Sequence, residues 1–310
     1  MLKMFYRLLG ALLFVFLGYG LGEAASQSKN YEKILWSYLE KVYSFGPRYS
    51  GSEGHQKLQN FLINEGNRLA DSTRSQSFFH RPKGGLPVPM NNIEFRFEGK
   101  LKGQKPILLG GHYDTRPFAD EEEDPKKAVK PILGANDGGS GTALLLGLAH
   151  YFSKNKPYRP IHIVFFDGED YGEKGTKYYF LGSKYYAKNL SRENSDWPAW
   201  VAVFDMVADR NLEIYREKYS MKNASWLVDE IFNASRKVEG GDRFINEQRF
   251  SILDDHYPFI LRNIPSVLII DMIYPDWHKE SDTLEKCSSK SLYTVFKVFI
   301  ETLNTLERFR

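Results

Sequence analysis

The chain has 310 residues, 42% of them hydrophobic and 26% charged, which is typical of a globular protein with a substantial core. That length suits one large α/β domain or two small ones. The net charge of +3 is small, and no basic stripe interleaved with aromatic residues is present, so a nucleic-acid partner is not expected. Because Cys287 is the only cysteine, no intrachain disulfide can form, and stability must come from the core or from a bound metal.

The first 25 residues differ in kind from the rest. Lys3 and Arg7 precede an apolar run over residues 8–21, and Gly22-Glu23-Ala24-Ala25 follows it. This order is typical of a secretory signal peptide, and the run is shorter than the ~18–20 residues of a spanning helix. We expect residues 1–25 to be a cleaved signal, with an uncleaved N-terminal membrane anchor as the alternative. The mature chain is then extracytoplasmic, secreted or periplasmic, and meets a membrane only if this segment is retained.

Hydrophobic periodicity predicts helices and strands along the remaining chain. A 3.6-residue period indicates helices, whereas apolar or alternating β-branched runs indicate strands. Gly46-Pro47 ends the first helix, and Ser52 opens the second. In chain order we expect a helix over 31–45, a helix after Ser52, strands over 75–79, 92–97 and 106–111, a helix over 142–152, a strand over 160–166, a helix over 181–189, a strand over 200–206, a helix over 226–237, a strand over 267–270 and a helix over 292–306.

The order of these elements predicts the fold class. Strands that alternate with helices favour a single α/β domain, with a mostly parallel, twisted central sheet flanked by helices. Neither an internal repeat nor a linker divides the chain, so we expect one domain over residues 26–310. The acidic block at residues 120–124 is typical of a solvated loop.

Metal-compatible side chains follow four of the predicted buried strands. In chain order they are His112, Asp114, Asp137, Glu169, Asp170, Asp205 and His278. Ligand sites in open α/β sheets lie at the carboxyl ends of strands. Imidazole and carboxylate groups without thiolates suit zinc, and a catalytic zinc site uses three protein ligands and an open position. Each side chain alone could cap a strand or brace a turn, but together they favour a metal centre.

A glycine-rich loop precedes the helix expected over residues 142–152. Glycines at 134, 138, 139 and 141 could let it cradle a phosphate. The loop lacks the Lys-Ser/Thr of a P-loop and the G-x-G-x-x-G spacing, and Asp137 would repel an anion. We therefore expect the glycines to let Asp137 approach a cation.

These motifs resemble the zinc aminopeptidase superfamily, and further motifs resemble glutaminyl cyclases (glutaminyl-peptide cyclotransferases), especially bacterial members of the animal type. The resemblance runs from about Tyr31 to the C-terminus. The superfamily motifs are His112-Tyr113-Asp114, Asn136-Asp137-Gly138-Gly139-Ser140-Gly141, Gly168-Glu169-Asp170, Asp205 and His278. The cyclase motifs are residues 115–120, 131–137 and 166–172, Leu181-Gly182-Ser183, Asp254-Asp255-His256 and Trp277-His278.

The resemblance implies one Zn²⁺ per chain, held by Asp137, Asp170 and His278. His112 would either contact the residues that hold that metal, without binding it, or bind a second metal. Animal cyclases carry Glu where Asp170 stands, so the metal must lie nearer the backbone here.

The resemblance also implies a reaction, the cyclisation of N-terminal glutaminyl residues of peptides and proteins to pyroglutamate with release of ammonia. Glu169 would transfer protons, supported by Asp205 and Asp254, and Trp277 would form a wall for the substrate side chain. Animal members carry a Trp in the loop after the two acids, where this chain has Tyr178-Tyr179.

Two other functions remain open at this point. A two-zinc aminopeptidase would find candidates for all its ligands here, but Trp277, and Asp254 where aminopeptidases usually carry a small residue, favour the cyclase. A non-catalytic zinc-binding interaction module is the third reading. Glu169 argues against it, because that carboxylate is not needed to hold the metal.

Overall fold

The computed structural model describes residues 30–172 and 177–308. The segment predicted to be a signal peptide or anchor lies outside these residues. Across the part of the chain that is described, no helix combines the length and apolar character needed to cross a membrane.

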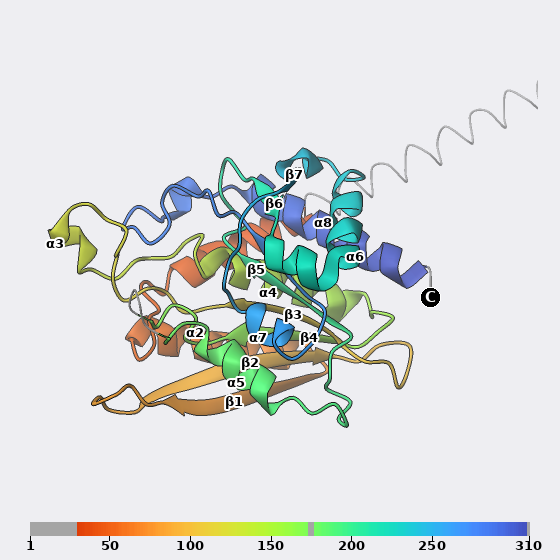
Figure 1. Ribbon diagram of the computed structural model, residues 1–310, viewed down its shortest axis with the longest axis horizontal. Helices are drawn as coiled ribbons and strands as arrows, with labels where there is room; N and C mark the ends of the chain where they lie inside the picture. Colours follow the sequence, from red (N-terminus) through yellow and green to blue (C-terminus); the bar gives the residue numbers. More distant parts are fainter. Residues whose placement is uncertain (1–29, 173–176, 309–310) are drawn as a thin grey trace, which may run out of the picture.

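A six-stranded sheet forms the centre of the molecule (Figure 1). Strands β4, β3, β5 and β8 run parallel to one another in that spatial order, whereas β2 pairs antiparallel with β4, and β1 at the edge pairs antiparallel with β2. The parallel strands are buried throughout, which explains their unbroken apolar sequences. The strands are β1 Ser72–His80, β2 Val88–Phe97, β3 Ile107–His112, β4 Ile161–Phe166, β5 Trp200–Asp205 and β8 Ser266–Ile270.

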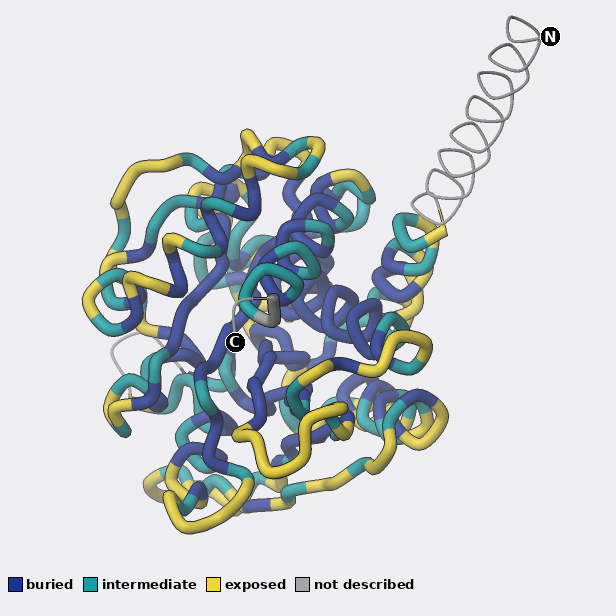
Figure 2. Tube along the Cα trace, turned by 90° about the vertical axis from the view of Figure 1, so that its right-hand side faces the viewer, coloured by how far each residue is buried: buried dark blue, intermediate teal, exposed yellow. Residues whose placement is uncertain are grey.

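Helices cover both faces of the sheet and enclose two hydrophobic cores. The larger core lies under α2, α4, α6, α8 and the helix over residues 30–43, and the smaller lies under α5 and α7. Figure 2 shows buried chain running through the middle of the molecule, with exposed chain confined mainly to its periphery. The helices are α2 Glu53–Leu69, α3 Pro125–Ala128, α4 Gly139–Lys154, α5 Leu181–Asn189, α6 Lys218–Ser235, α7 Tyr257–Ile260 and α8 Ser289–Arg308. The predicted single α/β domain with a mostly parallel sheet is confirmed, and the sheet is mixed at its β1 edge.

Some elements differ from the sequence-based expectation. Strands β6 (Ile214–Arg216) and β7 (Phe244–Gln248) form a separate two-stranded parallel sheet that was not predicted. Helix α6 begins at Lys218, two turns before the expected start at residue 226. Its first turn is polar, and the carboxylate of Glu217 accepts hydrogen bonds from the backbone N–H groups of Tyr219 and Ser220.

Candidate active site

The predicted metal-compatible side chains meet at the carboxyl edge of the parallel strands. His112 is the last residue of β3, and Asp205 is the last residue of β5. The loop after β4 carries Glu169 and Asp170, and the loop after β8 carries His278. The strand order thus brings together residues that are far apart in the sequence.

The loop that carries Asp137 is held in place by the carboxylate of Asp282. Asp282 accepts hydrogen bonds from the backbone N–H groups of Asn136 (2.9 Å) and Asp137 (3.0 Å). Gly138 has φ +71°, and a Cβ there would collide with the carbonyl of Asp114. The glycine therefore lets this loop pack closely against the backbone after β3, and Asp137 lies beside His112.

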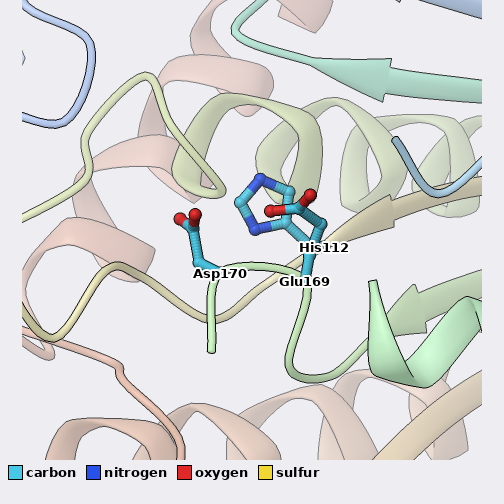
Figure 3. Close-up of side chains that lie close together, drawn as sticks. All are labelled: His112, Glu169 and Asp170. Atoms are coloured by element: carbon cyan, nitrogen blue, oxygen red, sulfur yellow. The ribbon is translucent and has the colours of Figure 1, made fainter. Parts of the chain in front are cut away.

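The loop after β4 is fixed by Asp114. Its two carboxylate oxygens accept hydrogen bonds from the backbone N–H groups of Glu169 and Asp170, each at 3.1 Å. Both side chains project to the same side of the loop, toward the ring of His112 (Figure 3), and one ligand atom of each of the three lies within 4.8 Å of the others.

Asp137, Asp170 and His278 form a cluster suited to a cation. Their ligand atoms all lie within 4.8 Å of one another, and His278 Nε2 is 3.5 Å from Asp137 Oδ2 and 3.3 Å from Asp170 Oδ1. The Oδ2 atoms of both aspartates are buried without a hydrogen-bond partner. Buried polar atoms are normally paired, so these two oxygens fit a site that a metal completes.

A second group shares Asp137. His112, Asp137 and Asp205 also bring their ligand atoms within 4.8 Å of one another. Here His112 Nε2 contacts Asp205 Oδ1 at 3.1 Å and Asp137 Oδ1 at 3.3 Å, so these atoms already satisfy one another. The second group also offers a set of ligands, but of the two unpaired oxygens it contains only the Oδ2 atom of the shared Asp137, whereas the first group contains those of both Asp137 and Asp170.

Crowded acids dominate the electrostatics of the metal-free site. Burial and the charge of Asp170 raise the pKa of Asp137 to about 7, and they raise the pKa of Glu169 well above its usual range. Burial and neighbouring acids also raise the pKa of Asp254. Burial alone would raise the pKa of Asp170 and lower that of His278, yet their mutual attraction brings these values to about 2 and about 9. A bound cation would lower the pKa of every acid in the group.

A cavity of about 530 Å³ opens onto this group. The cavity lining includes all the predicted site residues except His112 and Asp114, which are buried. The ring of Trp277 packs against that of His278, with centroids 4.1 Å apart and the two planes tilted by 33°. The remaining surface is largely apolar, and comprises Phe180, Met206, Phe250, Ile252, Leu253, Ile270 and Met272 together with Ser251.

Backbone strain gathers around this cavity. Among the described residues, four other than glycine have positive φ, and Phe180, Met206 and His278 all line the cavity. Non-glycine residues rarely adopt this conformation, and it persists where the surrounding structure enforces it. The strain therefore marks the same site as the orphaned oxygens.

Asp120 and Tyr179 are among the lining residues that the sequence did not assign to the site. Asp120 lies in the acidic block interpreted as a solvated loop, but its Oδ1 is 3.1 Å from His278 Nδ1. The structure thus corrects that interpretation for Asp120. Tyr179, in the loop after the acid pair, also lines the cavity. The chain is not helical over residues 116–120, so no periodic pattern in the sequence marked Asp120.

The fold and the two histidine–carboxylate groups define the class of zinc exopeptidases and glutaminyl cyclases built on a mixed α/β sheet. The family model "Peptidase family M28" matches residues 92–303, more than half of the chain. The chain belongs to peptidase family M28.

Relatives of two activities lie within this class. A crystal structure of Tannerella forsythia glutaminyl cyclase superposes with a TM-score of 0.82 at 32% identity, covering 88% of this chain and 97% of that one. A Zn-dependent exopeptidase from Parabacteroides distasonis gives 0.82 at 30% identity, with the same coverage. The glutaminyl-peptide cyclotransferase of Drosophila melanogaster is 23% identical over 283 residues, 82% of this chain and 76% of that protein.

Proposed function

We propose that this protein cyclises N-terminal glutaminyl residues of peptides and proteins to pyroglutamate and releases ammonia. Asp254 beside Glu169 at the cavity is the observation that carries the proposal, since it gives the site an acid beyond those needed for two metals. The similarity to two glutaminyl cyclases agrees with it. Asp137, Asp170 and His278 would hold a single zinc ion, which supplies a Lewis acid for the γ-carbonyl oxygen.

Glu169 is the proposed proton carrier. The substrate's α-amine attacks its own γ-carbonyl carbon, so one C–N bond forms as the amine loses a proton. The bond to the amide nitrogen then breaks, and that nitrogen leaves with a proton as ammonia. One carboxylate that accepts the first proton and returns it balances both steps. Asp205 and Asp254 lie at the same cavity, and burial together with the neighbouring acids raises the pKa of Asp254 well above its usual range.

Trp277 and Tyr179 are the proposed positioning surfaces. An intramolecular attack requires the side chain to fold back, so the site must exclude extended conformers. The indole packed against His278 limits the space on that side of the metal ligands, and Tyr179 lines the same cavity.

Hydrolysis of N-terminal residues by a two-metal aminopeptidase is the second candidate. The group His112, Asp137 and Asp205 favours it, because it could hold a second cation that shares Asp137 with the first. The direct contacts of His112 Nε2 with both carboxylates favour the one-metal alternative.

Two dipeptides and a metal analysis separate these candidates. With Gln-Ala the cyclase produces ammonia and a product whose N-terminus is blocked, and with Leu-Ala it releases no free leucine. We expect one zinc per chain in the purified protein. Free leucine without ammonia, with activity that follows the occupancy of a second zinc, would establish the aminopeptidase instead.

A further inference from the structure

Arg116, which is buried, and Asp120, which is half-buried, form an ion pair beside the proposed metal ligands. Arg116 Nη2 donates to Asp120 Oδ2, and Nε donates to Asp120 Oδ1 at 3.3 Å. The same Oδ1 atom lies 3.1 Å from His278 Nδ1. This contact turns the other ring nitrogen, Nε2, toward Asp137 and Asp170.

The opposite end of the guanidinium reaches a different ligand loop. Arg116 Nη1 donates to the backbone carbonyl of Asp170 at 2.9 Å and also to that of Gly172. Arg116 is buried, and its guanidinium lies over the Tyr179 ring, 5.2 Å from the centroid. One side chain therefore connects the loop after β4 with the side chain of His278.

Backbone contacts tie the Asp120 segment to the His278 loop as well. The N–H of Glu121 donates to the carbonyl of His278 at 3.3 Å, and Glu122 Oε1 accepts from the N–H of Glu280 at 3.1 Å. Lys130 forms an ion pair with Glu280 at 2.9 Å. These contacts are made where His278 holds a left-handed backbone, with φ 55°.

We infer that the Arg116–Asp120 pair is a positioning clamp that presets Asp170 and His278 for metal binding. A carboxylate on the far nitrogen of a ligand histidine fixes its tautomer and ring orientation and raises its basicity. Arg suits this place because its planar fork serves a carboxylate and two carbonyls at once, which an ammonium group cannot do with the same geometry. The inference rests on the proposed metal site but not on the cyclase reaction.

Zinc affinity measured without substrate tests the clamp. Competition with a chromophoric chelator would compare the wild type, Asp120→Asn and Glu123→Gln, the last removing one charge from an exposed position of the same segment. We expect Asp120→Asn to weaken zinc binding by about 10- to 100-fold, the usual effect of losing such a partner. Glu123→Gln should bind zinc as the wild type does. Binding of Co²⁺ should give Asp120→Asn a visible absorption spectrum different from that of the wild type, because the ligand geometry has changed.

Thermal unfolding of the zinc-free proteins separates positioning from simple structural support. The clamp predicts similar midpoints for the zinc-free wild type and Asp120→Asn, and a smaller gain for the variant when zinc is added. Equal zinc affinity in the two proteins, or an equal loss of stability with and without zinc, would overturn the inference.

Arg116→Lys is the second variant, for the case in which Asp120→Asn does not fold. Zinc binding that is roughly tenfold weaker than in the wild type supports the clamp, and wild-type affinity overturns it. If the wild type binds no zinc, both the proposed metal site and the clamp are wrong. If Asp120→Asn weakens zinc binding but the wild type releases no ammonia from a glutaminyl peptide, the clamp stands and only the proposed cyclase reaction is wrong.

Discussion

Asp167 and Asp170 stand three residues apart in the loop after β4, and both are buried, but their surroundings are opposite. Asp167 Oδ1 is 2.8 Å from His55 Nε2, and Asp167 Oδ2 accepts from the Tyr113 hydroxyl at 2.8 Å and the Asn91 N–H at 2.7 Å. The Oδ2 atom of Asp170 has no such partner. We call the first group, Asp167 with His55, Tyr113 and Asn91, the Asp167 cluster.

The difference shows that one loop can carry both a carboxylate that stabilises the fold and a carboxylate suited to binding a metal. A buried carboxylate surrounded by donors has its charge compensated within the fold, so it can fix a backbone. A buried carboxylate with an orphaned oxygen needs a cation from outside. The Asp167 cluster therefore anchors the loop, and Asp170, with Asp137 and His278, faces the place where a metal would bind.

Removing the metal should give the largest effect. We expect a strong chelator to abolish activity and zinc to restore it, and we expect His278→Ala to lose both bound zinc and activity, because one of three ligands is gone. Zinc content and ammonia release from a glutaminyl peptide measure both. His150→Ala, a half-buried histidine on α4, is the control and should keep its zinc. Full activity in the chelated enzyme would contradict the conclusion that Asp170, unlike Asp167, binds a metal needed for the reaction.

A smaller loss should follow from Glu169→Gln. The amide is similar in shape but cannot carry the proton, so turnover should fall by ~10²–10⁴ while the zinc content is unchanged. Turnover numbers, together with zinc content, check this. Near-normal turnover would remove Glu169 from the mechanism, and loss of zinc would make it a ligand, as the aminopeptidase requires.

The smallest effect concerns pH and the Asp167 cluster. Burial alone would lower the pKa of His55, but the charge and hydrogen bond of Asp167 raise it above 6.5. A raised pKa gives a stabilising contribution that is complete below pH ~6.5 and is lost as pH rises through the folded-state value. The free energy of unfolding in urea should therefore decline above pH ~6.5 in the wild type relative to His55→Gln. Parallel pH profiles for the two proteins would show that His55 is not the charged partner of Asp167.

Much of the candidate metal site could be predicted from the sequence, because its residues lie at or after the ends of strands. The unbroken apolar runs identified β3, β4 and β5, and the polar residue that follows or ends each run identified His112, Glu169, Asp170 and Asp205. Strand ends have a simple pattern, and parallel strands must place those ends at one edge. The site was predictable to that extent.

Other features depend on contacts that a linear pattern does not contain. Strand β7 (Phe244–Gln248) is largely exposed, so it has no apolar run, and β6 has three residues. The segment with Asp120 has the composition of a solvated loop, and only its packing against the His278 loop makes that carboxylate a partner of the site. The tertiary environment determined these outcomes, and local composition gave no sign of it.

The order of the strands in the sheet also affects the rates at which the protein folds and unfolds. Asp137, Asp170 and His278 follow different strands, and β3 lies between β4 and β5 in the sheet, so most of the sheet must be aligned before the three ligands meet. Contacts between such distant segments form late, because loop closure must precede them. An ion that requires all three ligands would then stabilise the native state more than the transition state. Zinc should lengthen the lifetime of the folded protein while leaving its rate of refolding nearly unchanged.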